Sequence, residues 1–539
     1  MEIKKESCER EANPPPRERE PFAPKNIFFA DGRFGGTRSE IRWLVCAFLI
    51  LVSTVSCGSG LGVPKGSGRE EISIAVSSNP RSLDPAFATG VTEGEITAKI
   101  FNGLVRFQGA GVVADLAETW SVTPDGRTWR FRLRRGVRFH DGRGFSARDV
   151  AYSFERILDP ALHSPRRWVL EKIKSIETPD SGTVILHLSS ASASFLSLLA
   201  MPAAYIVPAG TGGKSSGFGR HPIGTGPYRF REWEDDRHVL LERNPDYFGG
   251  AARAKHVRFL VIPEPLTALA LFRRGALDLT PVPSPQWPRL LSNPPPGRLL
   301  TADQLVTYYV AINTERFPDS RVRRAMNLAV DRNLIIEKIL AGLGTSASGP
   351  VPPALLPRPL DPIPYDPVRA EELLDEAEFD RARRIVLLRS SNRAALEPAT
   401  VIAGYLRDIG LNVKVEPMEF ASLRARVNNA DFDLCLFNWY ADYPDAENFL
   451  VPLFHSRNVG SAGNRARFRD ARTDRLLDRI ERLPAGRKRD EAVLAAVARI
   501  RQEAPWIFLW YPRQALAVSS KLDRYTAPVI FNGDKGLEY

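Results

Sequence analysis

The sequence predicts an α/β protein made of several packed lobes, on three observations. From Glu70 onwards, runs with apolar residues at every second position alternate with segments of helical periodicity. The chain has 539 residues, which is enough for two to four lobes rather than one core. Its hydrophobic fraction of 43% and its charged fraction of 25% are ordinary for a soluble globular protein.

Strand patterns dominate the first part of the alternating region. Ile72, Ile74 and Val76 occupy alternate positions and predict the first strand. A capped amphipathic helix follows and is predicted to end near Asn102 and Gly103. The strands predicted in this part span residues 71–78, 129–139, 183–190, 238–244, 256–262 and 305–313.

Helices and strands alternate in the second part. A helical pattern covers residues 321–342 and stops at Gly342. Asp366 and Pro367 favour the start of the next helix, because Asp caps a first turn and Pro fits the first helical position. The remaining predictions are a βαβ-like unit over residues 384–418, helices over 474–483 and 489–504, and a last strand over 506–519.

Charge and cysteine usage exclude several classes of protein. The net charge of +11 comes mainly from arginines spread along the chain, and the longest basic cluster covers only residues 486–489. This pattern indicates a solvated surface and no nucleic-acid partner. The four cysteines form no CxxC pair, and the seven histidines lack metal-ligand spacing. We therefore expect no disulfide framework, no metal site and no cofactor.

The N-terminus resembles a bacterial export signal. Residues 43–55 form an almost uninterrupted apolar run, which is too short to cross a bilayer because a span needs about 20 residues. Small residues then precede Cys57, as at lipoprotein cleavage sites, although Thr54 stands where Leu is usual. Lipidation of Cys57 is the expectation, and the alternatives are ordinary signal-peptidase cleavage and a short uncleaved anchor.

These features divide the N-terminal part into two segments and predict where in the cell the protein is located. Residues 1–57 are assigned to an N-terminal extension with a lipoprotein-like signal, and residues 58–69 to a flexible tether rich in Gly and Ser. The protein is expected to be exported to the periplasm or cell envelope and held at a membrane by a lipid anchor.

Residues 430–454 combine a buried strand pattern with an acidic and aromatic loop. Apolar residues lead into a segment that holds Trp439, Tyr440, Asp442, Asp445 and Glu447. Carboxylates over aromatic walls suit a cationic group such as an amine, whose charge needs a partner once it leaves water. The alternative is an acidic surface loop with its aromatic side chains packed underneath.

Catalytic motifs give no positive evidence for an enzyme. The chain contains no GxSxG elbow, no HExxH helix and no Walker loop. The GTGPY segment at residues 224–228 lacks the GK[ST] of a phosphate loop, so a tight turn is the better interpretation.

An ordered set of blocks gives the most specific evidence. They are SLDPAFATG at residues 82–90, LRRGVRFHDG followed by FSARDV within 116–160, PIGTGPYRF, VRRAMNLAVDRNLIIEKILAGLG, and DFDLCLFNWYADYPDAENF. Together they resemble the bacterial extracellular solute-binding proteins of family 5, the oligopeptide- and dipeptide-binding type of peptide ABC transporters. The resemblance extends from about Ile72 to the C-terminus.

The resemblance implies a bilobal α/β fold of the periplasmic-binding-protein type, a "Venus flytrap" of type II or cluster C with an inserted subdomain. Ligand binding would close the two lobes over the ligand. The implied division gives a discontinuous domain I from residues 70–108, 220–305 and 510–539, a subdomain from residues 109–219, and domain II from residues 306–509.

The resemblance also implies a set of ligand-binding residues. An aspartate in a W-x-x-D pattern holds the α-amino group of the peptide in this family, and Trp439, Tyr440 and Asp442 match that pattern. Members that select short peptides hold the carboxylate terminus with a cationic side chain near the start of the βαβ unit. Arg389 and Arg393 lie in that region, where a solvated Arg is the alternative.

The implied function is a monomeric, non-enzymatic receptor that delivers peptides to a membrane permease driven by an ATPase. One alternative keeps the fold and changes the ligand to a nickel chelate, an oligosaccharide or an opine. Others are a peptide receptor or chaperone without a transport role, and an envelope peptide hydrolase.

Overall fold

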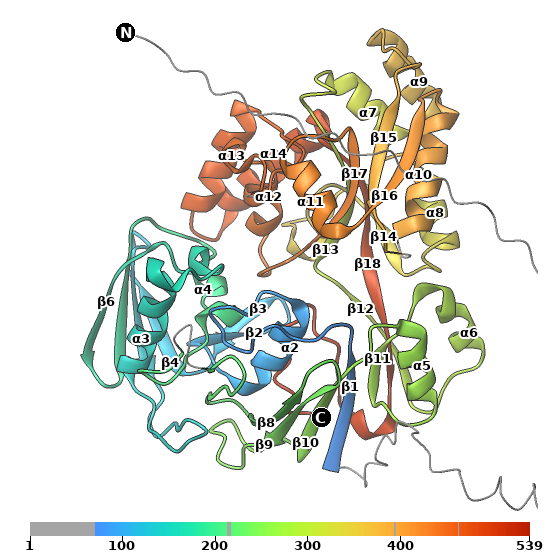
Figure 1. Ribbon diagram of the computed structural model, residues 1–539. Helices are drawn as coiled ribbons and strands as arrows, with labels where there is room; N and C mark the ends of the chain where they lie inside the picture. The colour runs from blue at the N-terminus through green and yellow to red at the C-terminus, as the bar shows by residue number, and fades with distance from the viewer. Residues whose placement is uncertain (1–69, 213–216, 393–394, 462) are drawn as a thin grey trace, which may run out of the picture. The chain divides into compact units, whose positions relative to one another are not determined.

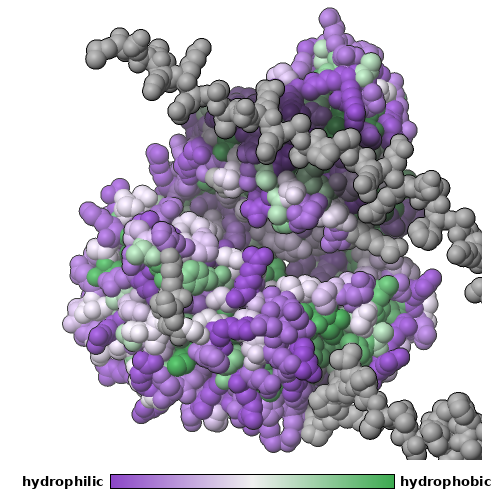
Figure 2. All heavy atoms as spheres, in the orientation of Figure 1, coloured by the Kyte–Doolittle hydropathy of each residue, from purple (hydrophilic) through white to green (hydrophobic). Residues whose placement is uncertain are grey.

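The computed structural model describes residues 70–212, 217–392, 395–461 and 463–539. The predicted signal, Cys57 and the tether therefore lie outside the described residues. Within the described part, no helix combines the length and apolarity that a bilayer span requires. Hydrophilic side chains dominate the face seen in Figure 2, and apolar atoms reach it in smaller patches.

One large mixed sheet organises most of the described chain. Its strands lie in the order β16, β15, β17, β13, β18, β11, β1, β10, β9 and β8, with β12 and β14 also paired to β18. In chain order these are β1 Glu71–Val76, β8 Tyr228–Glu234, β9 His238–Arg243, β10 His256–Val261, β11 Leu279–Pro281, β12 Arg298–Asp303, β13 Val306–Ile312, β14 Gly344–Ser346, β15 Ile385–Ser390, β16 Val413–Met418, β17 Leu434–Tyr440 and β18 Trp506–Val518.

The long strand β18 joins two parts of this sheet (Figure 1). Its first residues pair with β13, with Ala311 opposite Trp506. Its last residues pair with β12 and β11, with Arg298 opposite Val518. The segment that connects β12 to β13 is a second connection between the two parts.

Helices cover both faces of the part that contains β13, β15 and β17 (Figure 1). One face packs against α7 Ser320–Leu328, α8 Arg332–Lys338, α9 Pro367–Glu376 and α10 Leu396–Asp408. The other face packs against α11 Phe420–Asn428, α12 Glu447–Phe454, α13 Ala471–Arg482 and α14 Arg487–Glu503. Alternate residues of β17 serve the two faces, as the period of a strand requires, with Cys435 on one and Leu436 on the other.

The part that contains β1 and β8–β11 has its own core. The helix α2 Val91–Ile100 packs with β1 and β8–β10 through Ile96 and Ile100. The helices α5 Pro265–Arg273 and α6 Trp287–Ser292 cluster with Ala515 and Ala517 of β18.

A second antiparallel sheet forms a separate core between these segments. Its strands lie in the order β4 Ala117–Val122, β5 Thr128–Leu133, β7 Thr183–Leu188 and β6 Ile173–Asp180. The same core includes the two-stranded β2 Val105–Gln108 and β3 Gly111–Ala114 and the helices α3 Ala147–Leu158 and α4 Phe195–Leu198.

Helix boundaries test the local predictions. The start at Asp366 and Pro367 is confirmed, because the Asp366 side chain accepts a hydrogen bond from the Arg369 amide at the start of α9. The single helix predicted over residues 321–342 is wrong. The first helix, α7, ends at Leu328, and a second helix, α8, begins at Arg332. The Asp331 side chain caps α8 by accepting a hydrogen bond from the Leu334 amide.

Candidate functional site

The loop that follows β17 is the centre of the candidate site. β17 is antiparallel to β13, and its last residue, Tyr440, lies opposite Val306. The following residues form a short turn, after which α12 begins at Glu447. The acidic and aromatic segment therefore ends in a helix, although the sequence predicted a loop through Glu447.

Asn448 fixes the conformation of this turn. Its buried side-chain oxygen accepts hydrogen bonds from the Trp439 indole nitrogen, at 3.1 Å, and from the Asp442 backbone amide, at 3.0 Å. The Trp439 side chain is therefore fixed by its hydrogen bond to Asn448. Of the two predicted residues, Trp439 and Asp442, Asp442 has the side chain that can adjust more easily to a ligand. Asn448 could not be predicted from the sequence, because an Asn in the first turn of a helix has no distinctive pattern.

The Asp442 carboxylate is paired with a cation from a distant segment. Arg166 Nη1 lies 3.3 Å from Asp442 Oδ1, and the exposed fraction of the Asp442 side chain is 25%. Two further hydrogen bonds hold the Arg166 guanidinium, to the carbonyl oxygens of Ala88 and Thr89. Burial raises the pKa of Asp442 above its ordinary value, and the charge of Arg166 opposes this rise.

The other two acids of the loop belong to a buried network. Arg489 Nη2 lies 2.8 Å from Asp445 Oδ1 and 3.2 Å from Glu447 Oε2. Arg489 also donates to the Ile480 carbonyl, and Ser194 donates to Glu447 Oε1. Burial and the neighbouring Asp445 raise the pKa of Glu447 to about 7. These contacts are structural, so Asp442 is the acid of the loop that is most available to a ligand.

Arg389 lies at the end of β15 and is buried. Its Nη1 donates to the Ser390 carbonyl at 2.8 Å, whereas its Nε has no hydrogen-bond partner among the described residues. Its guanidinium has no carboxylate within ion-pair distance in the part of the chain that the structure describes. Arg393, the other predicted carboxylate ligand, lies outside the described residues.

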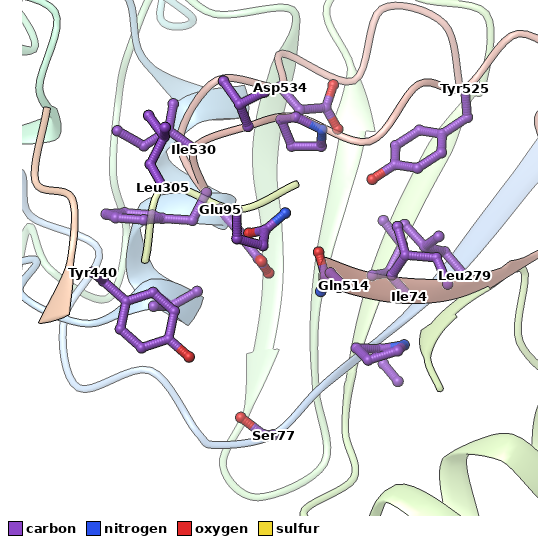
Figure 3. A pocket seen from close by; sticks show the side chains of 18 of the residues that line it. Ile74, Ser77, Glu95, Leu279, Leu305, Tyr440, Gln514, Tyr525, Ile530 and Asp534 are labelled. Atoms are coloured by element: carbon purple, nitrogen blue, oxygen red, sulfur yellow. The ribbon is translucent and has the colours of Figure 1, made fainter. Parts of the chain in front are cut away.

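A cavity of about 290 Å³ opens beside the loop. Tyr440 and Ala441, the two residues before Asp442, form part of its wall. Figure 3 shows Tyr440 and Leu305 on one side of the space and Gln514 on the opposite side. The volume is close to the lower end of small-molecule sites, which span about 300–1,000 Å³. Sequence reasoning missed this cavity because its walls come from segments far apart in the chain.

Among residues 70–539 without the gaps stated above, no group of three or more His, Cys, Asp or Glu side chains is arranged to hold a metal ion. The one cysteine in that part, Cys435, belongs to β17 and is buried in the core on one face of the sheet, where burial raises the pKa of its thiol.

Comparison with known families identifies the chain's relatives. Residues 111–461 match the model of the bacterial extracellular solute-binding proteins, family 5, over its middle region. The chain belongs to this family. The predicted resemblance is confirmed.

Individual relatives match over most of their length. Heme-binding protein A of Haemophilus influenzae is 30% identical over 478 residues, which cover 82% of this chain and 87% of that protein. Di/tripeptide-binding protein 2 of Pseudomonas aeruginosa is 31% identical over 477 residues, which cover 82% of this chain and 89% of that protein.

A solved family 5 structure confirms the predicted fold class, a bilobal α/β periplasmic binding protein. The Helicobacter pylori periplasmic binding protein DppA, in complex with the peptide STSA, has a TM-score of 0.74 and 26% identity. The match covers 86% of this chain and 97% of that chain.

Proposed function

We propose that this protein is the substrate-binding component of an ABC importer, which binds short peptides between its lobes and delivers them to a membrane permease with its ATPase. The observation that carries the proposal is the partly exposed Asp442 carboxylate, held at the end of β17 beside the cavity. Relatives named for di- and tripeptides and the relative solved with a peptide support it.

The amino end of the peptide is proposed to bind at Asp442. The Asn448 contacts hold the backbone at this position, and the carboxylate already accepts a cation in Arg166. An ammonium group is a cation of the same charge, so it can share or replace that partner. Trp439 and Tyr440 complete the proposed site, Trp439 as support for the turn and Tyr440 as a wall of the cavity.

The carboxylate end is proposed to bind Arg389 or Arg393. Arg389 supports this because its guanidinium is buried and, among the described residues, makes only one hydrogen bond, to a carbonyl. Burying a cation without an acidic partner costs free energy. A ligand carboxylate would offset this cost by accepting two hydrogen bonds from the guanidinium.

Closure is proposed to follow the predicted division of the chain, with domain II formed by residues 306–509 and the subdomain by 109–219. The change of strand partners along β18 supports one crossing near residues 511–513, and the gap between β12 and β13 supports the other. Lipidation of Cys57 and a monomeric, non-enzymatic form complete the proposal.

Isothermal titration with matched tripeptides tests the proposal. Peptides with free termini are compared with their N-acetylated and C-amidated forms on the wild-type protein and on Asp442→Ala and Arg389→Met. Acetylation or Asp442→Ala is expected to cost on the order of 2–5 kcal/mol of binding free energy, as for a buried charge left unpaired. Amidation is expected to weaken binding to the wild-type protein and to have no added effect on Arg389→Met.

Asp431→Ala is the matched control, because Asp431 is an exposed acid that precedes the same strand and pairs with Arg316 and Arg426. Equal binding of free and acetylated peptides would reject the assignment of Asp442. If no free peptide binds the wild-type protein, the peptide proposal itself fails.

A further inference from the structure

The cavity beside Tyr440 has a mixed lining. Many of its lining residues are apolar and come from several strands and from the C-terminal segment, among them Ile74, Phe259, Leu279, Leu516, Val529 and Ile530. Three charged side chains also reach it, Glu95 and Lys99 of α2 and Asp534. Figure 3 shows Glu95 and Asp534 among the side chains that surround the space. The charges of these three groups decide what the cavity can hold.

Lys99 and Asp534 neutralise each other. Lys99 Nζ lies 3.5 Å from Asp534 Oδ2, and it also donates to the carbonyl oxygens of Glu95 and Asp534. Asp534 accepts a further hydrogen bond from the Tyr539 hydroxyl. Both charges are therefore satisfied within the chain and are not available to a ligand.

Glu95 is in a different situation. Among the described residues, its carboxylate has no hydrogen bond and no ion pair. Burial raises the pKa of Glu95 to about 7, and the nearby Asp534 adds to this rise while Lys99 opposes it. The charge of Glu95 in turn contributes to the raised pKa of the neighbouring Tyr525 and Tyr539. With Glu95 ionised, the charged side chains that line the cavity carry a net charge of −1, because Lys99 and Asp534 balance each other.

We propose that this cavity is a side-chain subsite for a basic residue of the peptide, with the Glu95 carboxylate as its counter-ion. The apolar wall suits the methylene groups of a lysine or arginine side chain, and the carboxylate suits its charged end. Because Tyr440 and Ala441 line the cavity directly before Asp442, a peptide held there by its amine has a nearby side chain in position to enter. The inference rests on the proposed peptide function and adds a substrate class to it.

A lysine scan against norleucine tests the subsite. Ala-Ala-Ala and its variants with lysine or norleucine at each position are titrated calorimetrically against the full-length protein and Glu95→Gln. Norleucine keeps the aliphatic chain and removes the charge. At one position, lysine is expected to bind the wild-type protein about tenfold more tightly than norleucine, as for a hydrogen-bonded charge. Glu95→Gln, which keeps the shape of the side chain, is expected to abolish this preference.

The pH dependence gives a second readout. A cationic side chain binds the ionised form of Glu95, so the preference for lysine is expected to grow from pH 6 to pH 8, by up to about tenfold. The ratio between the two peptides cancels the titration of their common α-amino group. Glu95→Gln is expected to show no such growth, and Glu118→Gln, a change of an exposed acid that pairs with Arg132, is expected to behave like the wild-type protein.

The outcomes separate the two proposals. A wild-type protein that binds Ala-Ala-Ala but prefers norleucine at every position overturns the subsite and leaves the peptide function intact. A preference for lysine that survives in Glu95→Gln also overturns the role of Glu95. If no peptide of the set binds the wild-type protein, both the peptide function and the subsite are rejected.

Discussion

Asp442 and Asp445 lie three residues apart in one turn, yet their partners differ in kind. Asp445 shares the buried Arg489 with Glu447, and that arginine comes from α14, which packs on the same face of the sheet. Asp442 meets Arg166 through one contact of 3.3 Å, and Arg166 comes from the segment between α3 and β6. The Asp445–Arg489 pair lies on one face of the large sheet, and Ser194 connects Glu447 to the region of the second sheet. The Asp442–Arg166 pair itself joins two separately packed regions.

The contrast shows why composition alone could not rank these acids. A carboxylate that is buried against a fixed arginine is not available to form an ion pair with a ligand. A carboxylate that is one-quarter exposed and has a single cationic contact can exchange that contact at low cost. The role of each acid therefore follows from where its partner is anchored.

Loss of Arg489 should give the largest effect on stability. Arg489→Met leaves Asp445 and Glu447 buried without their common cation, which is expected to cost about 3–5 kcal/mol in the free energy of unfolding. Denaturant unfolding measures this change. Arg487→Met is the matched control, because Arg487 is almost fully exposed and pairs only with Glu491 one turn away. Similar stabilities of the two variants would show that the network is not a structural unit.

The pH dependence of the same network should give a smaller effect. The pKa of Glu447 rises from 4.5 to about 7 on folding, chiefly through burial. The folded state therefore holds this proton more tightly, so the contribution is full below about pH 4.5 and is lost as the pH rises through 7. Between pH 5 and pH 8 the loss should reach at most about 3 kcal/mol.

Glu447→Gln isolates this contribution. Unfolding free energies of the wild-type protein and the variant are measured at pH 5, 6, 7 and 8, and their difference is followed. We expect the wild-type protein to lose stability relative to the variant as the pH rises. A constant difference would contradict the raised pKa of Glu447.

Loss of Arg166 should give the smallest effect on stability and an opposite effect on binding. Arg166→Met removes one partly exposed ion pair, which is worth about 1 kcal/mol. Without this internal cation, the peptide amine becomes the main partner of Asp442, so affinity is expected to rise several-fold. Calorimetry with free and N-acetylated peptides checks this, and weaker binding of the free peptide would show that Arg166 positions Asp442 for the ligand.

Much of the architecture could be predicted from the sequence. The alternating patterns predict strands such as β13 and β18 and the helix α9 with its Asp366 cap, because these signals lie within short segments. The break between α7 and α8 was missed because Asp331 lies inside an uninterrupted helical pattern, where its capping hydrogen bond cannot be distinguished from a surface position.

The site was less predictable for a related reason. Asp442 could be singled out because the W-x-x-D pattern is local. Arg166, its partner, lies 276 residues away in the sequence, and only the folded chain brings the two together. Glu95 lies on an amphipathic helix among other charged residues, so no periodic pattern indicates that its carboxylate reaches a cavity.

The strand β18 has a mechanical consequence. Between the residues that pair with β13 and those that pair with β12 stands Pro512, which has no amide hydrogen, and its carbonyl accepts a hydrogen bond from the Gln304 amide. The two chain segments that connect the parts of the large sheet thus contact each other at this hydrogen bond. Gln304 also lines the cavity, so a group that fills the cavity lies close to the hydrogen bond between Gln304 and Pro512. If the proposed closure turns about this contact, a small displacement at the contact becomes a larger movement at residues farther from it.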